Sequence, residues 1–419
     1  MKRAALQFYR LALLVAMAWI IRAHHARLRI GGLVPVTVEE VRGMYPAVAR
    51  LDLDPGERAG WFVKDGEGRE LGYVVRTSPV GEGSVGYRGW TDSLIAFDAA
   101  LRVVGVRIRS SQDTREHVGD VRDDRTFLKT WNGKPWDEVA RTTPEEAGIE
   151  GVSGATKTSM AVAEAIQRRL ASANEALARA PVPMRIRARD AGLALVVLAG
   201  TVLAFTGTHG RLWLRRGFQV LVVVYVGFVN GDLLAQSLIV GWAQAGVPWR
   251  TAPGMVLLLA ASLVVPWAGG KPLYCHHLCP HGAVQEWLAI RRWRLALPRD
   301  FAAGLRWLPP LLLALVVAIS MLVLPIDLAD LEAFDAYLIR SAGVATIVIA
   351  IAGLIASLFI PMAYCHYGCP TGALLNFIRS HGRADRFCRR DMTGALLVAL
   401  AAVFAWKYAA IHAWMVAAG

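Results

Sequence analysis

Cysteine is scarce in this chain, and the few cysteines are unevenly placed. The 419 residues include five, and none lies among the first 274. This distribution excludes a disulfide framework for the long polar stretch that precedes them. Acidic residues are also in the minority, since 33 Asp and Glu face 46 Lys and Arg, for a net charge of +13. Basic residues beside apolar membrane segments set topology and contact anionic lipid headgroups. The charge therefore predicts membrane lipid, and no nucleic acid, as a partner.

Long apolar runs fill the C-terminal half of the chain, which is 55% hydrophobic, and they predict a membrane protein. Spanning helices are expected at 191–208, 218–240, 253–268, 307–326, 341–361 and 394–411. A shorter apolar stretch, Leu11 to Ile21, lacks a convincing A-x-A cleavage site. We interpret residues 1–29 as an uncleaved anchor helix, with the Arg10 side chain snorkelling to the interface. With the six helices of residues 181–419, the expected all-α polytopic membrane bundle has about seven helices.

Residues 30–180 are polar and predict a folded α+β domain. Period-two patterns indicate strands at 71–75, 94–97 and 104–108. A helix is expected from Met160 to about Ala180, where Pro181 and Pro183 would end it. Because this domain follows an anchor helix, we expect it to be exported.

A ten-residue segment with two cysteines occurs twice, ninety positions apart. It reads YCHHLCPHGA at 274–283 and YCHYGCPTGA at 364–373, and seven positions are identical in register. The four thiolates would come from Cys275, Cys279, Cys365 and Cys369. Thiolates are soft ligands that select iron–sulfur clusters, zinc or copper(I). The proline after each second cysteine can open a helix whose N–H groups favour anionic sulfur.

More than one metal site fits this repeat. Two cysteines in one loop cannot complete four-thiolate ligation, whereas two such loops on one face, related by a pseudo-twofold axis, can share a site. We therefore expect the four cysteines to hold one iron–sulfur cluster jointly, with 4Fe–4S favoured over 2Fe–2S. One alternative is a cluster in each loop, completed by another group or by a neighbouring histidine among His276, His277, His281 and His366. The others are a four-cysteine zinc site and a repeated helix cap with structural thiols.

The distribution of basic residues predicts the topology. Three expected helices separate the polar domain from the first cysteine loop, and two more separate the loops, so the loops share the side opposite to the domain. Loops on the cysteine side carry fourteen Arg and Lys residues, against two in the short loops of the other side. The cysteine loops are therefore expected in the cytoplasm, whose reducing conditions suit unpaired thiols. Arg185, Arg187 and Arg189 oppose this assignment, but long domains translocate largely regardless of charge.

A glycine-rich turn is predicted ahead of the helix in the polar domain. It comprises Glu150, Gly151, Val152, Ser153, Gly154, Ala155 and Thr156. Ser153 is expected to cap the helix, and exposed N–H groups at a helix start form an anion site that suits phosphate. On these residues alone, an ordinary capped helix is the competing interpretation.

This turn resembles the flavinylation motif of the FMN-binding domains in Rnf/Nqr flavin subunits and in the NosR family. The matching positions include Ser153, Gly154 and Ala155. The resemblance implies that a flavin transferase joins FMN, through its phosphate, to the hydroxyl of Thr156, with Thr158 as the second choice. Glu150 stands where the family usually has Asp.

The order of an exported FMN domain, a membrane bundle and two C-x-x-x-C-P loops resembles the NosR/NirI family over nearly the whole chain. The segments GYRGW at 86–90 and QDT at 112–114 also look like parts of its flavin domain. Family members often end in a ferredoxin-like segment with two further cysteine clusters. This chain reaches Gly419 without one and is expected to be a shortened member, so a role in nitrous oxide reduction is not implied.

These observations predict a multi-pass protein of the bacterial inner membrane, with its FMN domain in the periplasm. It would transfer electrons as a component of a larger system, from a cytoplasmic-side donor or a quinol to an extracytoplasmic redox acceptor. Flavin exchanges one or two electrons and can therefore join a pair donor to single-electron acceptors. The alternatives are a redox-sensing regulatory or maturation protein and a membrane flavoprotein with a structural zinc site.

Four further residues are functional candidates. Asp232 is expected inside an apolar helix, where a costly acid would shuttle protons, contact a quinol or make an interhelical hydrogen bond. His209 and His412 lie near helix ends and could ligate a haem, although interfacial solvation is the simpler interpretation. Cys388 has no cysteine neighbour and is expected to be a free thiol.

Overall fold

The computed structural model forms two compact units. The sheet unit comprises Leu28–Met184 and Ala245–Arg250, and the helical unit comprises Met1–Arg27, Arg185–Gln244 and Thr251–Gly419. The structure describes residues 3–31, 36–54, 56, 58–173, 186–206, 212–288, 294–295, 297–324, 326–338 and 342–418. Each unit is considered by itself below.

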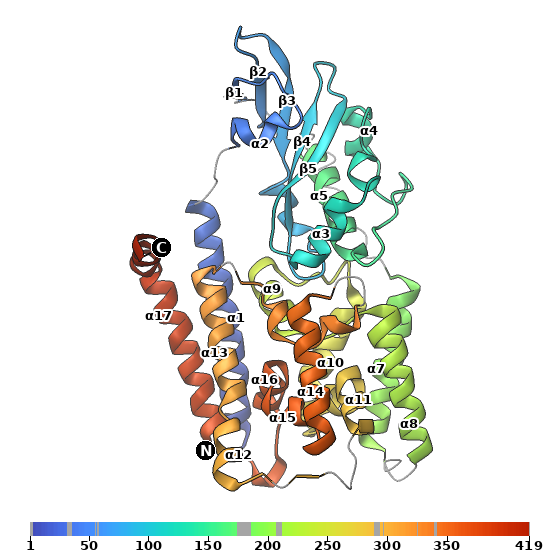
Figure 1. Ribbon diagram of the computed structural model, residues 1–419, viewed down its shortest axis with the longest axis vertical. Coiled ribbons are helices and arrows are strands. Elements are labelled where there is room, and N and C mark those ends of the chain that lie inside the picture. The colour runs from blue at the N-terminus through green and yellow to red at the C-terminus, as the bar shows by residue number, and fades with distance from the viewer. Residues whose placement is uncertain are drawn as a thin grey trace. The chain divides into compact units, whose positions relative to one another are not determined.

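A five-stranded antiparallel meander forms the centre of the sheet unit (Figure 1). Its strands, in spatial and chain order, are β1 (Arg50–Leu53), β2 (Trp61–Lys64), β3 (Glu70–Arg76), β4 (Thr91–Phe97) and β5 (Val103–Ser111). The three predicted strands coincide with β3, β4 and β5 and are confirmed. Sequence patterns missed β1 and β2 because each has only four residues, too few to show a period of two.

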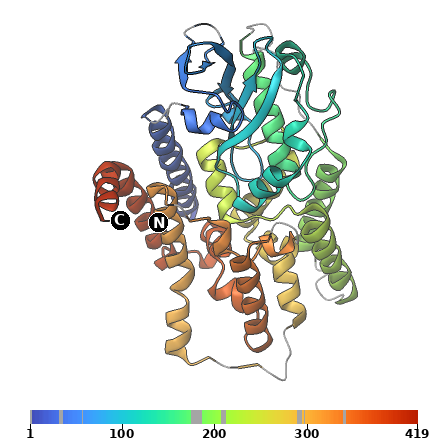
Figure 2. The ribbon, with the colours of Figure 1, turned by 45° about the horizontal axis from the view of Figure 1, so that its top comes forward.

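Helices cover both faces of this sheet (Figure 2). The alternation along β4 sends Ile95 and Phe97 to one face and Leu94 and Ala96 to the other, all of them buried. The first face packs against α3 (Arg115–Asp123), α4 (Trp136–Arg141) and α5 (Thr156–Ala171), and the second against α2 (Val38–Arg42). Short 3-10 helices lie at η1 (Val80–Gly83) and η2 (Phe127–Lys129). A large apolar side chain buried in this way contributes about 1.5–3 kcal/mol.

The start of α5 differs from the prediction. The helix begins at Thr156 instead of Met160, and its N-cap is Ala155, which supplies no side-chain hydrogen bond. The prediction that Ser153 caps the helix is therefore wrong. Gly154, with φ of 91°, turns the chain between Ser153 and the helix, and a residue with a side chain rarely adopts this conformation.

Helix α5 also ends earlier than expected, at Ala171 instead of about Ala180. The helix ends where its contact with the sheet core ends, because Leu170 and Ala171 are its last buried apolar side chains. Arg169 fixes this end, since its Nε donates to the carbonyl oxygen of Arg76 at 2.9 Å. Burial lowers the pKa of the Arg169 guanidinium. Pro181 and Pro183 lie outside the described residues.

The helical unit contains the expected all-α bundle. Its long elements are α1 (Arg3–Gly31), α7 (Ala188–Phe205), α8 (Leu212–Leu221) with its π-helical continuation η4 (Val222–Asn230), α10 (Pro253–Gly269), α12 (Arg299–Leu305) followed by α13 (Leu308–Leu322), α14 (Val344–Phe359) and α17 (Arg389–Ala418). Within the described part of the chain, five segments are long and apolar enough to cross a membrane, and α10 and α14 are shorter apolar helices. Together they account for the seven helices predicted. Short helices include α9 (Gln236–Ala245), η7 (Ala329–Leu331), η8 (Asp335–Tyr337) and η9 (Gly382–Ala384).

The apolar run 218–240 is not one helix, contrary to prediction. Helical structure stops at Asn230, residues 231–235 are non-helical, and α9 follows. Gly231 adopts the left-handed conformation, with φ of 68°, which ends the helix. Asp232 therefore lies in a buried break and not inside a helix, and its carboxylate accepts a hydrogen bond from the Asn230 amide at 2.7 Å.

Arg10 does not extend to the interface, contrary to prediction, because its side chain is fully buried between α1 and the start of α17. Its Nε lies 2.6 Å from Asp391 Oδ1, and its Nη1 lies 2.9 Å from Asp385 Oδ2. Two carboxylates thus neutralise the buried cation, as burial of a charge requires. Burial alone would raise the pKa of Asp385, but the hydrogen bonds from Arg10 and the His381 N–H, together with the charges of Arg10 and Arg390, outweigh burial and lower the pKa. Helices α1, α13 and α17 run side by side (Figures 1 and 2).

Candidate redox sites

Each cysteine repeat folds into the same pair of short helices. The first cysteine lies on η5 (Tyr274–Leu278) or α15 (Ala363–Tyr367), and the second directly precedes α11 (Pro280–Leu288) or α16 (Pro370–Ile378). The second cysteine is extended in both copies, which directs its sulfur to the start of the following helix. Proline occupies the first helical position, where a missing N–H costs nothing.

Backbone N–H groups point at the second sulfur of each repeat. The Gly282 N–H donates to Cys279 Sγ at 3.4 Å, and the Gly372 N–H donates to Cys369 Sγ at 3.1 Å. These N–H groups stabilise negative charge on each second sulfur, as the proline position predicts. Gly282 leaves no space for a side chain, because a Cβ there would lie 2.8 Å from the Cys275 carbonyl oxygen.

Two tyrosines anchor the repeats in equivalent ways. The Tyr274 hydroxyl accepts the N–H of Leu234 at 2.9 Å, and the Tyr364 hydroxyl accepts the N–H of Ala333 at 3.1 Å. Each acceptor satisfies a buried N–H group in a non-helical segment, the first after η4 and the second after α13. These bonds explain why tyrosine precedes the first cysteine in both copies, a feature that the sequence showed without revealing its purpose.

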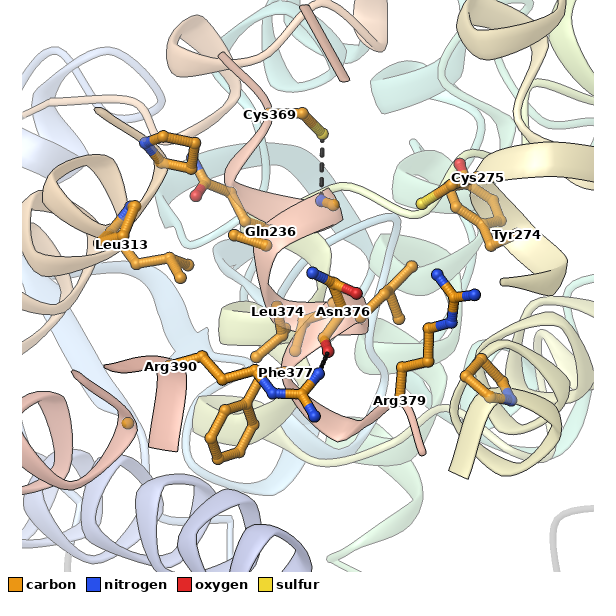
Figure 3. Close-up of a pocket in the computed structure, with 18 of the residues that line it drawn as sticks. Gln236, Tyr274, Cys275, Leu313, Cys369, Leu374, Asn376, Phe377, Arg379 and Arg390 are labelled. Atoms are coloured by element: carbon orange, nitrogen blue, oxygen red, sulfur yellow. Dashed lines mark hydrogen bonds between the residues drawn. The ribbon is translucent and has the colours of Figure 1, made fainter. Parts of the chain in front are cut away.

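Contacts between the repeats bring their cysteines to one region. The Gln285 Nε2, from the first repeat, donates to Cys365 Sγ of the second repeat at 3.1 Å. The same amide accepts a hydrogen bond from Ser357 Oγ at 3.0 Å, which fixes its orientation. Cys275, Cys365 and Cys369 line a single cavity, and Figure 3 shows Cys275 and Cys369 at its wall. Sequence reading missed Gln285 because glutamine has no counterpart there in the second repeat, which has Leu375.

The donor set is one that iron–sulfur clusters use. Four cysteine thiolates are the usual ligands of a 4Fe–4S cluster. Among the described residues, no group of three or more His, Cys, Asp and Glu side chains is arranged to hold a single metal ion.

The turn before α5 exposes one of the two candidate flavin acceptors. Thr156 is half-buried, and its hydroxyl donates to the Val152 carbonyl oxygen at 3.2 Å. The Thr158 side chain is completely buried, and its hydroxyl donates to Asp113 Oδ2 at 2.6 Å. Of the turn residues, Ser153, Gly154 and Glu150 are exposed and Ala155 is buried. A transferase could therefore reach Thr156 from this surface without opening the core, whereas Thr158 would have to leave it.

Asp113 connects this helix start to two other segments. Its carboxylate accepts the N–H groups of Tyr87 and Arg88, each at 2.9 Å. With the bond from Thr158, these contacts bring segments 86–90 and 112–114 together beside α5, two segments that the sequence marked separately. Gly86 is required here, because a Cβ would lie 2.3 Å from Asp113 Oδ2.

Aromatic and basic side chains lie beside the segments that Asp113 joins. The Tyr87 ring stacks on His117 with a centroid distance of 4.8 Å and an interplanar angle of 26°. The Lys157 ammonium group lies 6.0 Å from the Tyr87 ring centroid. Lys157 follows Thr156 directly and adds positive charge at the start of α5, where a phosphate would be favoured. The sequence analysis did not single out His117 or Lys157, although the adjacency of Lys157 was visible.

Among the described residues, the candidates His412 and Cys388 contact groups outside the two sites. His412 is exposed and lies against Tyr408, with ring centroids 5.5 Å apart. Cys388 is a free cysteine, as predicted, and contacts Asp391. His209 lies outside the described residues.

Family models match both parts of the chain. One described as a 4Fe-4S binding domain matches residues 251–298 and 342–388, which contain the two cysteine repeats. Another, described as an FMN-binding domain, matches residues 86–171, which contain Thr156. No solved structure matches the chain.

Three known proteins are similar to parts of the chain. Protein NirI of Paracoccus denitrificans is 28% identical over 204 residues, covering 42% of this chain and 30% of that protein. Regulatory protein NosR of Pseudomonas aeruginosa is 29% identical over 180 residues, covering 39% of this chain and 25% of that protein. Putative electron transport protein YccM of Escherichia coli is 32% identical over 140 residues, covering 29% of this chain and 38% of that protein. The chain thus spans less than two fifths of the length of each relative. The FMN-binding and 4Fe-4S binding domains, together with these relatives, make the chain similar to NosR/NirI-type flavo-iron–sulfur membrane proteins.

Proposed function

We propose that the chain transfers electrons between a cytoplasmic-side or quinol donor and an extracytoplasmic redox acceptor, through a 4Fe–4S cluster and covalently bound FMN. The observation that carries this proposal is the convergence of the two cysteine repeats on one cavity, in a chain that also has an FMN-binding domain. An iron–sulfur cluster supplies single-electron chemistry, and a flavin can exchange one or two electrons.

One cluster is shared by Cys275, Cys279, Cys365 and Cys369. The bond from Gln285 to Cys365 supports sharing, because it joins the first repeat to a ligand of the second. The paired N–H bonds to Cys279 and Cys369 support it as well, since they stabilise equivalent thiolates in both repeats. The protein's part is to fix the sulfurs and to shield them from water.

FMN is joined to Thr156 by a flavin transferase, which recognises the surrounding turn. The half-buried position of Thr156 supports this choice over the buried Thr158. The helix start and Lys157 would hold the phosphate by charge.

The FMN domain is periplasmic and the cysteine repeats lie toward the cytoplasmic side of the inner membrane. Three apolar segments support this topology by separating the two sites in the chain: α7, α8 with η4, and α10. The basic residues on the cysteine side favour the cytoplasm for that side.

A regulatory or maturation role is the second candidate, because one similar protein bears the name Regulatory protein NosR. Both roles use the same groups and differ in whether electrons pass through them in steady state.

The test is purification of the full chain after co-expression with a flavin transferase. Visible and EPR spectra before and after dithionite should reveal a reducible 4Fe–4S cluster, and the denatured band should fluoresce in a gel. A colourless protein with zinc and no sulfide would overturn the proposal. Steady reduction of a soluble electron acceptor by quinol would separate electron transfer from a sensing role, in which turnover is absent.

A further inference from the structure

A large cavity lies inside the helical unit, beside the cysteines. Its volume is about 1050 Å³, far more than the sulfur-lined end requires. Most of its wall is aliphatic and comes from α1, α10, α13 and α17, with residues such as Leu13, Met17, Leu259, Leu313, Val317 and Leu397. Figure 3 shows Cys275, Cys369 and Gln236 around one part of it. Such a wall suits an apolar molecule drawn from the membrane.

Two polar side chains in this wall have no hydrogen-bond partner. The Gln236 side chain lines the cavity at 1% exposure, and within the described part of the chain neither its amide oxygen nor its amide nitrogen is paired. Ser262, on α10, also lines the cavity, is fully buried, and has an unpaired hydroxyl among these residues. Buried polar groups are nearly always paired, and leaving one unpaired is costly. Their presence in the wall therefore indicates a ligand with polar atoms.

Gln236 is held in place by its main chain. Its backbone N–H donates to Glu332 Oε2 at 2.6 Å, and Glu332 also accepts the N–H of Thr371, at 3.3 Å, from the second cysteine repeat. The unpaired amide is thus attached to the same framework that positions Cys369. A molecule bonded to Gln236 would lie near the sulfur-lined end of the cavity.

The hydrogen bonds that the Gln236 amide and the Ser262 hydroxyl can make indicate the chemistry of the ligand. A carboxamide offers both a donor and an acceptor, and a serine hydroxyl can do either. A hydrocarbon chain would satisfy neither, and a lipid phosphodiester can only accept. Among the arginines in the wall, Arg379 donates to the Gly270 carbonyl oxygen and Arg390 to that of Asn376, each at 2.8 Å, and the Arg389 guanidinium lies 4.7 Å from the Trp307 ring centroid. A ring with hydroxyl oxygens on a long apolar tail can pair both atoms of the amide, and a ring with carbonyl oxygens can pair the amide N–H and the serine hydroxyl.

We infer that this cavity binds the head group of an isoprenoid quinol or quinone, with Gln236 and Ser262 hydrogen-bonded to its ring oxygens. The inference rests on the proposed function and names the site of its membrane-soluble partner. Tyr274 and Phe377 supply aromatic surface to the same cavity, which suits a flat ring.

The experiment measures binding of decylubiquinone to the full chain in nanodiscs, with empty nanodiscs to subtract partitioning into lipid. Wild type should show saturable binding. Gln236→Leu should weaken it about tenfold, the effect of losing one or two hydrogen bonds, and Ser262→Ala somewhat less. The double variant should combine the two losses. Ser262→Thr keeps the hydroxyl and should stay within a few-fold of wild type.

Ser237→Ala is the matched control, because Ser237 is fully buried and its hydroxyl is unpaired among the described residues, yet it does not line the cavity. Its affinity should equal that of wild type. Absent binding in wild type, unchanged affinity in the double variant, or displacement of the quinone by phosphatidylglycerol would overturn the site. Flavin and iron spectra of the same samples separate the outcomes, since normal spectra without quinone binding would remove this site and leave the proposed function intact.

Discussion

The flavin turn and the cysteine site are assembled over very different distances along the chain. Thr156 is positioned by a turn of a few residues and by the start of α5, with Asp113 as its main distant support. The cysteine site combines two segments ninety positions apart, joined by Gln285 and anchored at two helix breaks. A site formed within one turn tolerates loss of a single distant contact, whereas a shared site depends on every segment that contributes to it.

The largest effect is expected where ligation is shared. Changing one cysteine, for example Cys275→Ser, should remove nearly all iron and acid-labile sulfide, because three thiolates hold a cubane poorly. Iron analysis and EPR spectra of the dithionite-reduced protein measure this loss. Cys388→Ser is the control, since that thiol lies outside both repeats. Retention of about half the iron, with an unchanged second signal, would instead mean one cluster per repeat.

The local site should lose its flavin without loss of its fold. Thr156→Val should abolish in-gel flavin fluorescence in cells that express a flavin transferase, because the acceptor hydroxyl is gone. The sheet unit should remain folded, since the Thr156 side chain makes one hydrogen bond among the described residues, to the Val152 carbonyl oxygen. Hydrogen exchange of the full chain checks the fold. A fluorescent Thr156→Val band beside a dark Thr158→Val band would move the attachment to Thr158.

Thr158→Val should lower the stability of the sheet unit but leave flavin attachment intact. It removes a buried hydrogen bond to a carboxylate that also accepts N–H groups from Tyr87 and Arg88. The expected cost is about 1–3 kcal/mol of unfolding free energy in the sheet unit. Faster hydrogen exchange across segments 86–90 and 112–114 would register it, with flavin still attached to the folded fraction. Equal exchange in wild type and variant would show that Asp113 is not the connecting group.

The pseudo-symmetry of the cysteine repeats predicts matched effects from two tyrosine variants. Tyr274→Phe and Tyr364→Phe each leave one buried N–H unpaired, at a cost of about 1–2 kcal/mol. The thermal unfolding midpoint in detergent should fall by a similar amount in both. A large drop in only one variant would mean that one repeat carries most of the stability and that the equivalence is only geometric.

The smallest effect concerns the pH dependence of a surface contact in the sheet unit. Burial alone would raise the pKa of Glu40, but hydrogen bonds from Arg109 and Thr37 outweigh it and lower the pKa. A depressed carboxyl pKa adds stability above the ordinary Glu value, about 4.3, and this contribution is lost as pH falls through the folded-state pKa. Glu40→Gln should therefore lower the unfolding free energy of the sheet unit by about 1 kcal/mol at pH 7 and by almost nothing near pH 3. Hydrogen exchange of the full chain at the two pH values measures this difference. A cost that is constant with pH would assign the effect to packing.

Local patterns in the sequence were sufficient for much of this protein. Period-two alternation indicated β3, β4 and β5, because one residue in two meets a core face. Apolar runs located the bundle helices, and the repeat identified the cysteines, because spanning length and ligand chemistry depend on composition and spacing. Other features required coordinates. Gly231 ended a helix inside an apolar run, and Arg10 found two carboxylates more than 370 positions away in the chain.

The sites show the same division. The sequence motif marked Thr156 as the acceptor and Thr158 as the second choice, and only the fold showed that Thr158 is buried against Asp113 while Thr156 is half-buried. Sequence counted four cysteines, but their convergence depends on Gln285, Tyr274 and Tyr364. The hydrogen-bond partners of these residues lie 31 to 80 positions away in the chain, beyond the reach of any local pattern. The unpaired amide of Gln236 became visible only once its surroundings were known, because a missing hydrogen bond is a property of the whole neighbourhood and not of a residue type.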